Sequence, residues 1–160
     1  MSVYLDIETR AVPGLGWDRQ YITVVGFFHK STGLRQLIWP DLSGESLAAE
    51  LPEAGRIYTF NGNSFDLKVI RQKLGLDLLD RYKSRDLMYD CWSNGLKGGL
   101  KAVERRLGIV RSQAPLSNNE IQRCWTRWKH KQDEDALRCL LKYNEEDVMN
   151  LVILREKLGI

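Results

Sequence analysis

The sequence predicts an α/β fold with a mixed five-stranded sheet flanked by helices, and three features of the residue pattern indicate it. The opening residues alternate between apolar and polar with the period of a strand. The segments 21–30 and 34–39 are strand-like and are joined by a short turn, as in an antiparallel hairpin. Short strands then alternate with helical segments, so the sheet is mixed and helices cover its faces. We expect the opening strand to lie centrally.

The composition predicts one domain spanning residues 1–160, long enough for a hydrophobic core. Its 43% hydrophobic and 28% charged residues are ordinary for a globular protein, and its net charge of +3 mildly favours an acidic partner. No apolar run approaches the roughly 18 residues of a membrane span, and no signal peptide precedes the first strand. We therefore expect a cytoplasmic monomer with no membrane association. Cys91, Cys124 and Cys139 lack the spacing of a zinc site or a disulfide framework and are expected to be reduced.

The opening strand, residues 3–9 (VYLDIET), carries two carboxylates on one face. Asp6 and Glu8 are two residues apart, so their Cβ atoms lie roughly 6–7 Å apart in an extended chain. Like charges on one face repel unless a positive charge lies between them. Clustered hard oxygen ligands suit Mg²⁺ or Mn²⁺. A solvated acidic face on an edge strand is the alternative, and this strand alone does not decide between them.

The remaining elements follow from β-propensity, turn residues and helix caps. Before residue 90 we expect a loop at 10–20, a short helix at 46–51, a strand at 56–60, a turn at 61–64, a helix at 65–74, and a fifth strand at 85–89 that starts at Asp86. Beyond residue 90 we expect a helix at 96–108 that ends at Gly108, a helix capped by Asn118 or Asn119 and ending near Lys131, and a last helix that starts at Asp133 or Asp135 and ends near Leu158.

Two further acidic residues occupy informative positions. Asp66 lies in the first turn of a helix that follows a strand, where the helix dipole favours a carboxylate, so helix capping is one interpretation. Asp147 lies four residues after Tyr143 on the last helix, and the two side chains share a face. A surface acid beside a half-buried tyrosine is the simpler interpretation of that pair.

Together these residues resemble a known family. DIET at 6–9, NGNSFD at 61–66 and YNEED at 143–147 resemble, in order, the three exonuclease motifs of the DEDD superfamily, whose fold is ribonuclease H-like. The Tyr143-to-Asp147 spacing is that of the tyrosine-type (DEDDy) branch; the histidine-type branch has histidine where this chain has Lys142. The wider pattern is most similar to stand-alone ribonuclease H-like exonuclease domains of the YprB type, and proofreading domains of family B DNA polymerases share the three motifs. Arg10 departs from the Thr-Gly that follows many such first motifs.

The resemblance implies a metal-dependent 3′→5′ exonuclease that hydrolyses phosphodiester bonds at single-stranded DNA or RNA 3′ ends with two Mg²⁺ or Mn²⁺ ions. It implies that Asp6, Glu8 and Asp147 hold the ion that binds the attacking water. Asp6 and Asp66 would hold the second ion, and Tyr143 would orient the water. A tyrosine pKa near 10 makes an orienting hydrogen bond a better expectation than general-base action.

Several residues are expected to contact the nucleic acid: Thr9, Asn61, Phe65, Lys97, Lys101, Arg105 and Arg127. Other basic residues of the second half add to this charge: Arg106, Arg111, Arg123, Lys129 and Lys131. Trp125 and Trp128 interleave with part of that run, as in a groove that pairs phosphate contacts with base stacking. With Ile121 they also fit an apolar core stripe, so both interpretations stay open. Trp17 is a further stacking candidate.

Three positions are expected to be structural, and two other functions remain open. We interpret His29 and His130 as structural or surface residues and Asp86 as a cap that orders its surroundings. A nucleic-acid-binding module without turnover is one alternative function, but the complete set of four carboxylates and a tyrosine argues against it. A ribonuclease H-like endonuclease is the other, and the Tyr143-to-Asp147 spacing argues against it. The preference for DNA or RNA is not decided by the sequence.

Overall fold

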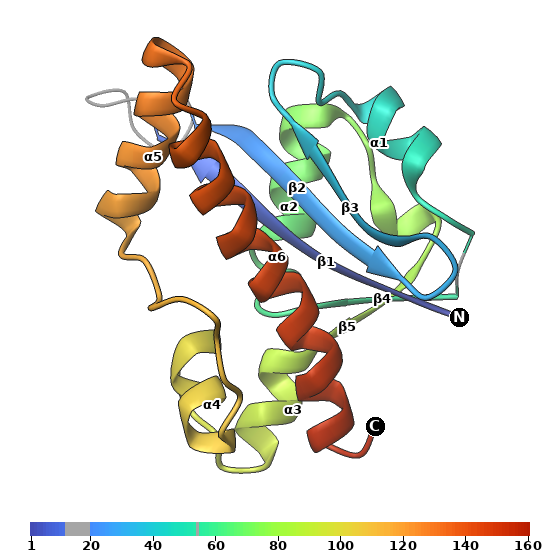
Figure 1. The fold of residues 1–160 in the computed structure, drawn as a ribbon. Coiled ribbons are helices and arrows are strands. Elements are labelled where there is room, and N and C mark those ends of the chain that lie inside the picture. Colours follow the sequence, from blue (N-terminus) through green and yellow to red (C-terminus); the bar gives the residue numbers. More distant parts are fainter. Residues whose placement is uncertain (12–19, 54) are drawn as a thin grey trace.

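The computed structural model describes residues 1–11, 20–53 and 55–160 (Figure 1). The strands are β1 (Ser2–Arg10), β2 (Tyr21–His29), β3 (Gly33–Ile38), β4 (Arg56–Thr59) and β5 (Lys83–Asp86). The helices are α1 (Gly44–Glu50), α2 (Asp66–Leu74), the 3₁₀ turn η2 (Leu78–Asp80), α3 (Leu87–Ser93), α4 (Leu100–Leu107), α5 (Asn118–Lys131) and α6 (Glu134–Lys157).

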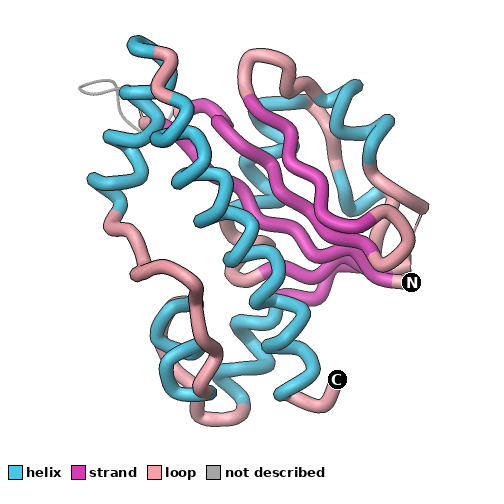
Figure 2. Tube along the Cα trace, in the orientation of Figure 1, coloured by secondary structure: helices cyan, strands magenta, loops and turns pink. Residues whose placement is uncertain are grey.

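The five strands form one mixed sheet in the order β3-β2-β1-β4-β5, with β1 in the centre (Figure 2). β2 pairs with β1 and β3 in antiparallel fashion, whereas β4 runs parallel to both β1 and β5. In this register Asp6 lies opposite Gly26 of β2. The mixed five-stranded sheet and the central position of the opening strand are therefore confirmed.

Helices cover both faces of the sheet, and the alternation of β1 assigns its residues to them (Figure 1). Val3, Leu5 and Ile7 belong to a core cluster completed by residues of α1 and α2. Tyr4 belongs to the opposite cluster, with residues of α3, α4 and α6. Because successive side chains of a strand point to opposite faces, Asp6 lies on the α6 side.

A glycine permits the close approach of α6 to the sheet. A Cβ atom placed on Gly26 would lie 2.0 Å from Oδ1 of Asn144 on α6, a separation that real Cβ atoms essentially never show. Asn144 itself donates a hydrogen bond from Nδ2 to Oδ2 of Asp6 at 3.0 Å. The missing side chain at position 26 therefore lets α6 approach β1 and bind its carboxylate.

The largest differences from the expected elements lie between residues 83 and 108. The fifth strand ends at Asp86 instead of starting there, because the Asp86 side chain accepts the Met88 N–H and caps α3, a helix not foreseen. The next helix starts at Leu100, four residues late. Gly98 has a φ of +105°, outside the helical region, and Gly99 is the N-cap.

Other helix ends lie close to expectation, although the cap of α5 was misplaced. Ser117 caps α5 in a capping box with Glu120, in place of Asn118 or Asn119. Asp133, one of the two expected starts, caps α6. The three cysteines form no disulfide. Among the described residues, no helix is long and apolar enough to cross a membrane.

Gly26→Ala is expected to lower the free energy of unfolding by about 1–3 kcal/mol, because the added methyl group overlaps Asn144 and strains the contact between α6 and the sheet. Denaturant unfolding of both proteins measures the difference. Gly55→Ala is the matched control: a Cβ atom there would meet nothing within 4 Å. Equal losses in the two variants would show that the close approach at Gly26 does not matter.

Candidate metal centre and active site

Three of the four expected metal ligands meet where α6 crosses the centre of the sheet. Asp6 and Glu8 come from one face of β1, and Asp147 comes from α6. One carboxylate oxygen from each residue lies within 4.8 Å of the other two. This grouping, called here the carboxylate cluster, is compact enough that its three carboxylates could hold one metal ion. Its donors are all hard oxygen atoms, which suit Mg²⁺ or Mn²⁺.

Asp66, the fourth expected ligand, lies beside the cluster but is not one of the three grouped residues. It is the first residue of α2, and its buried carboxylate accepts the backbone N–H of Ile7 at 3.1 Å. The N-cap of α2 is Phe65, which makes no side-chain capping bond. The Asp66 side chain is thus directed to β1, and its negative charge helps to raise the pKa of Asp6.

Burial and mutual repulsion raise the pKa values of three of these carboxyl groups. Burial, followed by the charges of Asp147, Asp66 and Glu8, raises the pKa of Asp6 well above its ordinary value. Burial and then Asp147 raise the pKa of Glu8 to about 8. Burial raises the pKa of Asp66 to about 7, although the Ile7 N–H acts in the opposite direction. Without a cation, the site therefore retains protons at neutral pH that a divalent ion would displace.

Two basic side chains, both from outside the carboxylate cluster, bind the Asp147 carboxylate. Lys101 of α4 donates to Oδ2, and Arg111, which follows α4, donates to Oδ1. The Arg111 side chain is only 5% exposed and makes two further hydrogen bonds of 2.7 Å to Glu104. Burial alone would lower the pKa values of both basic groups. Their acidic partners, Asp147 for both and Glu104 for Arg111, outweigh it, so both pKa values are raised and both side chains stay charged.

Tyr143 lies one turn before Asp147 and faces the same two basic side chains. Its ring centroid is 4.5 Å from Nζ of Lys101 and 5.6 Å from the guanidinium carbon of Arg111. The ring is buried among core residues that include Val24. Burial, and then the charge of Asp147, raise the pKa of Tyr143, so its hydroxyl keeps its proton at neutral pH. The tyrosine is therefore held in place and can donate a hydrogen bond at the cluster.

Asp86 orders the turn that leads into Asp66. Its carboxylate accepts the backbone N–H groups of Asn61 at 2.7 Å and Asn63 at 3.2 Å, in addition to capping α3. Asn61 has a φ of +64°, a backbone conformation that asparagine tolerates better than most residues. The interpretation of Asp86 as a residue that caps and orders local structure is confirmed.

Of the residues expected to contact nucleic acid, Lys101 alone is bound to a carboxylate of the cluster within the described part of the chain. The backbone carbonyl of Thr9 accepts a hydrogen bond from Gln122. Asn61 is exposed, whereas Phe65 packs partly against the core. The basic residues Lys97, Arg105 and Arg127 are exposed. Their contacts with nucleic acid stay predictions.

The structure decides between the two interpretations of the tryptophan pair in favour of the core. Trp125 is 2% exposed and donates its indole N–H to the hydroxyl of Tyr21, and Trp128 packs partly against the same cluster of core residues. His29 is buried beside Ser31, and His130 is exposed, in agreement with a structural or surface position. Trp17 lies outside the described residues.

Sequence reasoning missed three residues that hold the site together. Asn144 binds Asp6, although its place inside the YNEED motif, beside Tyr143, was a usable signal. The bond of Arg111 to Asp147 had no local signal, because the two residues are 36 apart in the chain. Glu104 pairs with Arg111 across the end of α4, where helical spacing no longer applies. Glu104 stands among the basic residues of α4, and a run of charges of this kind is typical of a solvent-exposed helix face.

The fold and the site together define the class of protein. A mixed sheet in the order β3-β2-β1-β4-β5, with acidic residues on its central strand and on a helix that crosses it, is a ribonuclease H-like arrangement. The profile of the family RNase_H_2, described as RNase_H superfamily, matches residues 3–159, and the chain belongs to this superfamily. The superfamily includes nucleases and exonucleases, and its nucleases usually use divalent metal ions.

A solved structure of a larger protein shares this fold. The family B DNA polymerase from the hyperthermophilic archaeon Pyrobaculum calidifontis matches 99% of this chain with a TM-score of 0.74 and 17% sequence identity. The chain spans 24% of the length of that polymerase. At this identity the similarity shows the fold alone. No curated protein matches the sequence.

Asp6→Asn is expected to leave the metal-free protein at least as stable as the wild type, because the variant loses a repelled charge and keeps an acceptor for Asn144. A carboxyl group whose folded-state pKa is raised contributes stability below its ordinary pKa of 3.8 and loses that contribution as the pH rises through the folded-state pKa. The advantage of the variant should therefore grow as the pH rises above 3.8. Melting curves in chelator from pH 4 to pH 8 measure it.

The same variant should lose most of the rise in melting temperature that Mn²⁺ gives the wild type, because a ligand stabilises only the state that it binds. Asp41→Asn, at an exposed position, is the control and should keep that rise. An Asp6→Asn protein that melts well below the wild type in chelator, or keeps the full Mn²⁺ effect, would show that Asp6 is not a metal ligand.

Proposed function

We propose that the chain is a metal-dependent 3′→5′ exonuclease of the tyrosine-type DEDD branch, similar to the YprB-type domains, that hydrolyses phosphodiester bonds at single-stranded DNA or RNA ends. The observation that carries the proposal is the carboxylate cluster, whose oxygens lie within 4.8 Å of one another, with Tyr143 one helical turn before Asp147. The order of the three motifs along the chain and the match to the RNase_H superfamily support it.

The carboxylates fit the divalent ions that the proposal requires. Asp6, Glu8 and Asp147 would hold one ion, and Asp6 with Asp66 would hold a second. The raised pKa values of Asp6 and Glu8 reflect burial and uncompensated negative charge, which is the environment that favours cation binding. A pair of bound Mg²⁺ or Mn²⁺ ions supplies an activated water and stabilises the leaving oxyanion.

The protein's own groups would position the reactants. The hydroxyl of Tyr143 is protonated and close to Asp147, so it can orient a water molecule by a hydrogen bond. Arg111 is fixed by Glu104 and in turn fixes Asp147, so that this carboxylate keeps one orientation. Lys101 binds the other oxygen of Asp147 and is partly exposed, which leaves it within reach of a substrate phosphate.

The decisive experiment uses linear and circular single strands with Mn²⁺. A 5′-labelled oligonucleotide should shorten progressively, a 3′-labelled one should release its label as a mononucleotide, and a circle should stay intact. DNA and RNA strands of matched sequence are tested in parallel. Asp147→Asn should abolish the products, whereas Glu145→Gln, which changes a carboxylate paired with Lys142 on the same helix, should not.

Each other outcome corresponds to a different function. A cut circle would identify a ribonuclease H-like endonuclease. Binding of both linear strands without any cleavage would identify a nucleic-acid-binding module. Loss of nucleotides from the 5′ end would reverse the proposed direction.

Tyr143→Phe is expected to lower the turnover number about tenfold, the effect of one hydrogen bond worth about 1.4 kcal/mol in the transition state. Only the hydroxyl is removed, so the Mn²⁺-induced rise in melting temperature and the affinity for a single strand should be nearly unchanged. Single-turnover rates at saturating Mg²⁺ measure the effect. A rate equal to that of the wild type would remove Tyr143 from the proposed mechanism.

A further inference from the structure

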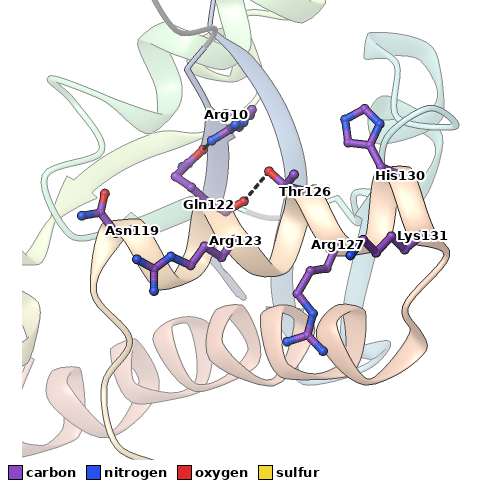
Figure 3. Close-up of a pocket in the computed structure, with 8 residues that line it drawn as sticks. All are labelled: Arg10, Asn119, Gln122, Arg123, Thr126, Arg127, His130 and Lys131. Atoms are coloured by element: carbon purple, nitrogen blue, oxygen red, sulfur yellow. Dashed lines mark hydrogen bonds between the residues drawn. The ribbon is translucent and has the colours of Figure 1, made fainter.

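A polar groove lies outside the carboxylate cluster, along the outer face of α5 (Figure 3). Its volume is about 590 Å³. It is lined by Arg10 of β1 and by seven α5 side chains: Asn119, Gln122, Arg123, Thr126, Arg127, His130 and Lys131. The described lining residues include four arginines and lysines and one histidine, and none of them is acidic. This surface, called here the α5 groove, is open to solvent and positively charged.

The spacing of the basic residues places them in one row. Arg123, Arg127 and Lys131 recur at intervals of four residues, so they lie on one side of the helix. Like charges at this spacing destabilise a helix by a few tenths of a kcal/mol per pair. The buried face of α5, with Ile121 and Trp125, already attaches the helix to the sheet. Packing therefore does not explain the row of positive charges.

Two members of the row have no acidic partner at close range. Arg127 pairs with Asp133 at 2.6 Å, but among the described residues no carboxylate lies within 4.0 Å of the charged groups of Arg123 or Lys131. Glu120, three residues before Arg123, is bound to Ser117 in the capping box. The side chains of Arg123 and Lys131 are thus available to an external anion.

The groove shares one strand, β1, with the carboxylate cluster, because Arg10 lines the groove and Asp6 and Glu8 belong to the cluster. Arg10 is two residues after Glu8 on β1, roughly 7 Å farther along the strand, and the pairing of β1 with β2 shifts its register between Glu8 and Thr9. Gln122 ties α5 to this point: it accepts a hydrogen bond from Arg10 at 2.6 Å and donates one to the carbonyl of Thr9 at 3.0 Å. From Asn119 to Lys131 the helix then extends over roughly 18 Å. The groove therefore adjoins the end of the strand that carries Asp6 and Glu8.

We propose that the α5 groove binds the sugar-phosphate backbone of the substrate strand, several nucleotides away from the end that is held at the carboxylate cluster. The inference rests on the proposed function, because it takes the occupant to be the strand that the cluster hydrolyses. Guanidinium and ammonium groups bind phosphate through charge-assisted hydrogen bonds. The helix places polar groups such as Asn119 beside them, which can also bind phosphate or sugar oxygens.

The chemistry of the groove also predicts how it selects a strand. Trp125, which lies on the same helix, is buried and is therefore not available for stacking on a base. Contacts to phosphates alone carry no sequence information, so binding should depend on salt and length but not on base sequence.

The test compares two double variants that each remove two exposed positive charges. Arg123→Ala with Lys131→Ala alters the groove, and Lys30→Ala with Lys157→Ala alters charges outside it. Dissociation constants for a 20-nucleotide and a 3-nucleotide single strand are measured in EDTA over a series of NaCl concentrations. The rate of hydrolysis of thymidine 5′-p-nitrophenyl phosphate with Mn²⁺ reports the catalytic centre separately.

For the groove variant we expect about tenfold weaker binding of the 20-nucleotide strand, with unchanged binding of the 3-nucleotide strand and unchanged hydrolysis of the small ester. The slope of log affinity against log salt should become shallower by about 1.4, since each lost phosphate contact on a single strand removes about 0.7. The control variant should match the wild type.

The inference is overturned if the groove variant binds the long strand as the wild type does, or if the control variant loses as much affinity. Failure of the proposed function gives a different result: the wild type then hydrolyses no strand, cuts a circle or removes nucleotides from the 5′ end, while the binding comparison still measures the groove. A melting curve for each variant confirms that it is folded.

Discussion

The repulsion among the carboxylates at the centre of the sheet is the interaction on which the rest of the structure depends. Three carboxylate oxygens lie within 4.8 Å of one another where burial reduces the screening by water. Both positive partners, Lys101 and Arg111, bind the same residue, Asp147. Asp6 and Glu8 have no such partner within the described chain, and their raised pKa values follow from burial and this imbalance. The uncompensated side of the cluster is thus the side that suits a cation.

A steric condition accompanies this electrostatic one. α6 supplies Asp147, Tyr143 and Asn144, so one rigid helix sets the positions of three functional side chains. Gly26 determines how closely that helix approaches the sheet, because any larger residue would displace Asn144. The chemistry of the site therefore depends on a residue that has no side chain and lies on the neighbouring strand, opposite Asp6.

The sequence predicted the features that depend on local periodicity. Alternation in the opening strand predicted that Asp6 and Glu8 share a face, and helical spacing placed Tyr143 beside Asp147. The pair of Arg111 with Asp147 joins residues 36 apart, and such a contact left no local pattern. The pair of Arg111 with Glu104, seven residues apart, spans the end of α4 at Leu107, so helical spacing does not predict it either. The helix after β5 was missed for a related reason. The residue pattern of 85–89 predicts a strand, but the strand ends at Asp86, because the side chain of Asp86 caps the helix that follows. The strand propensity of residues 85–89 therefore does not determine their structure, because it depends strongly on context.

The distribution of charge connects the carboxylate cluster with the α5 groove under the proposed function. A phosphate backbone that lies on Arg10 and the α5 row would bring its terminal phosphate toward a cluster of like charge. A bound divalent ion removes that repulsion, and the phosphate in turn adds negative charge that favours the ion. Glu8 and Arg10 are roughly 7 Å apart along the strand, which is less than the Debye length of about 10 Å at 0.1 M salt, so salt screens their interaction only in part. Thermodynamic linkage then requires that the metal ion raise the affinity for the strand by the same factor by which the strand raises the affinity for the ion. The cluster repels the phosphate of the strand in the absence of the ion and thereby favours the strand and the ion together.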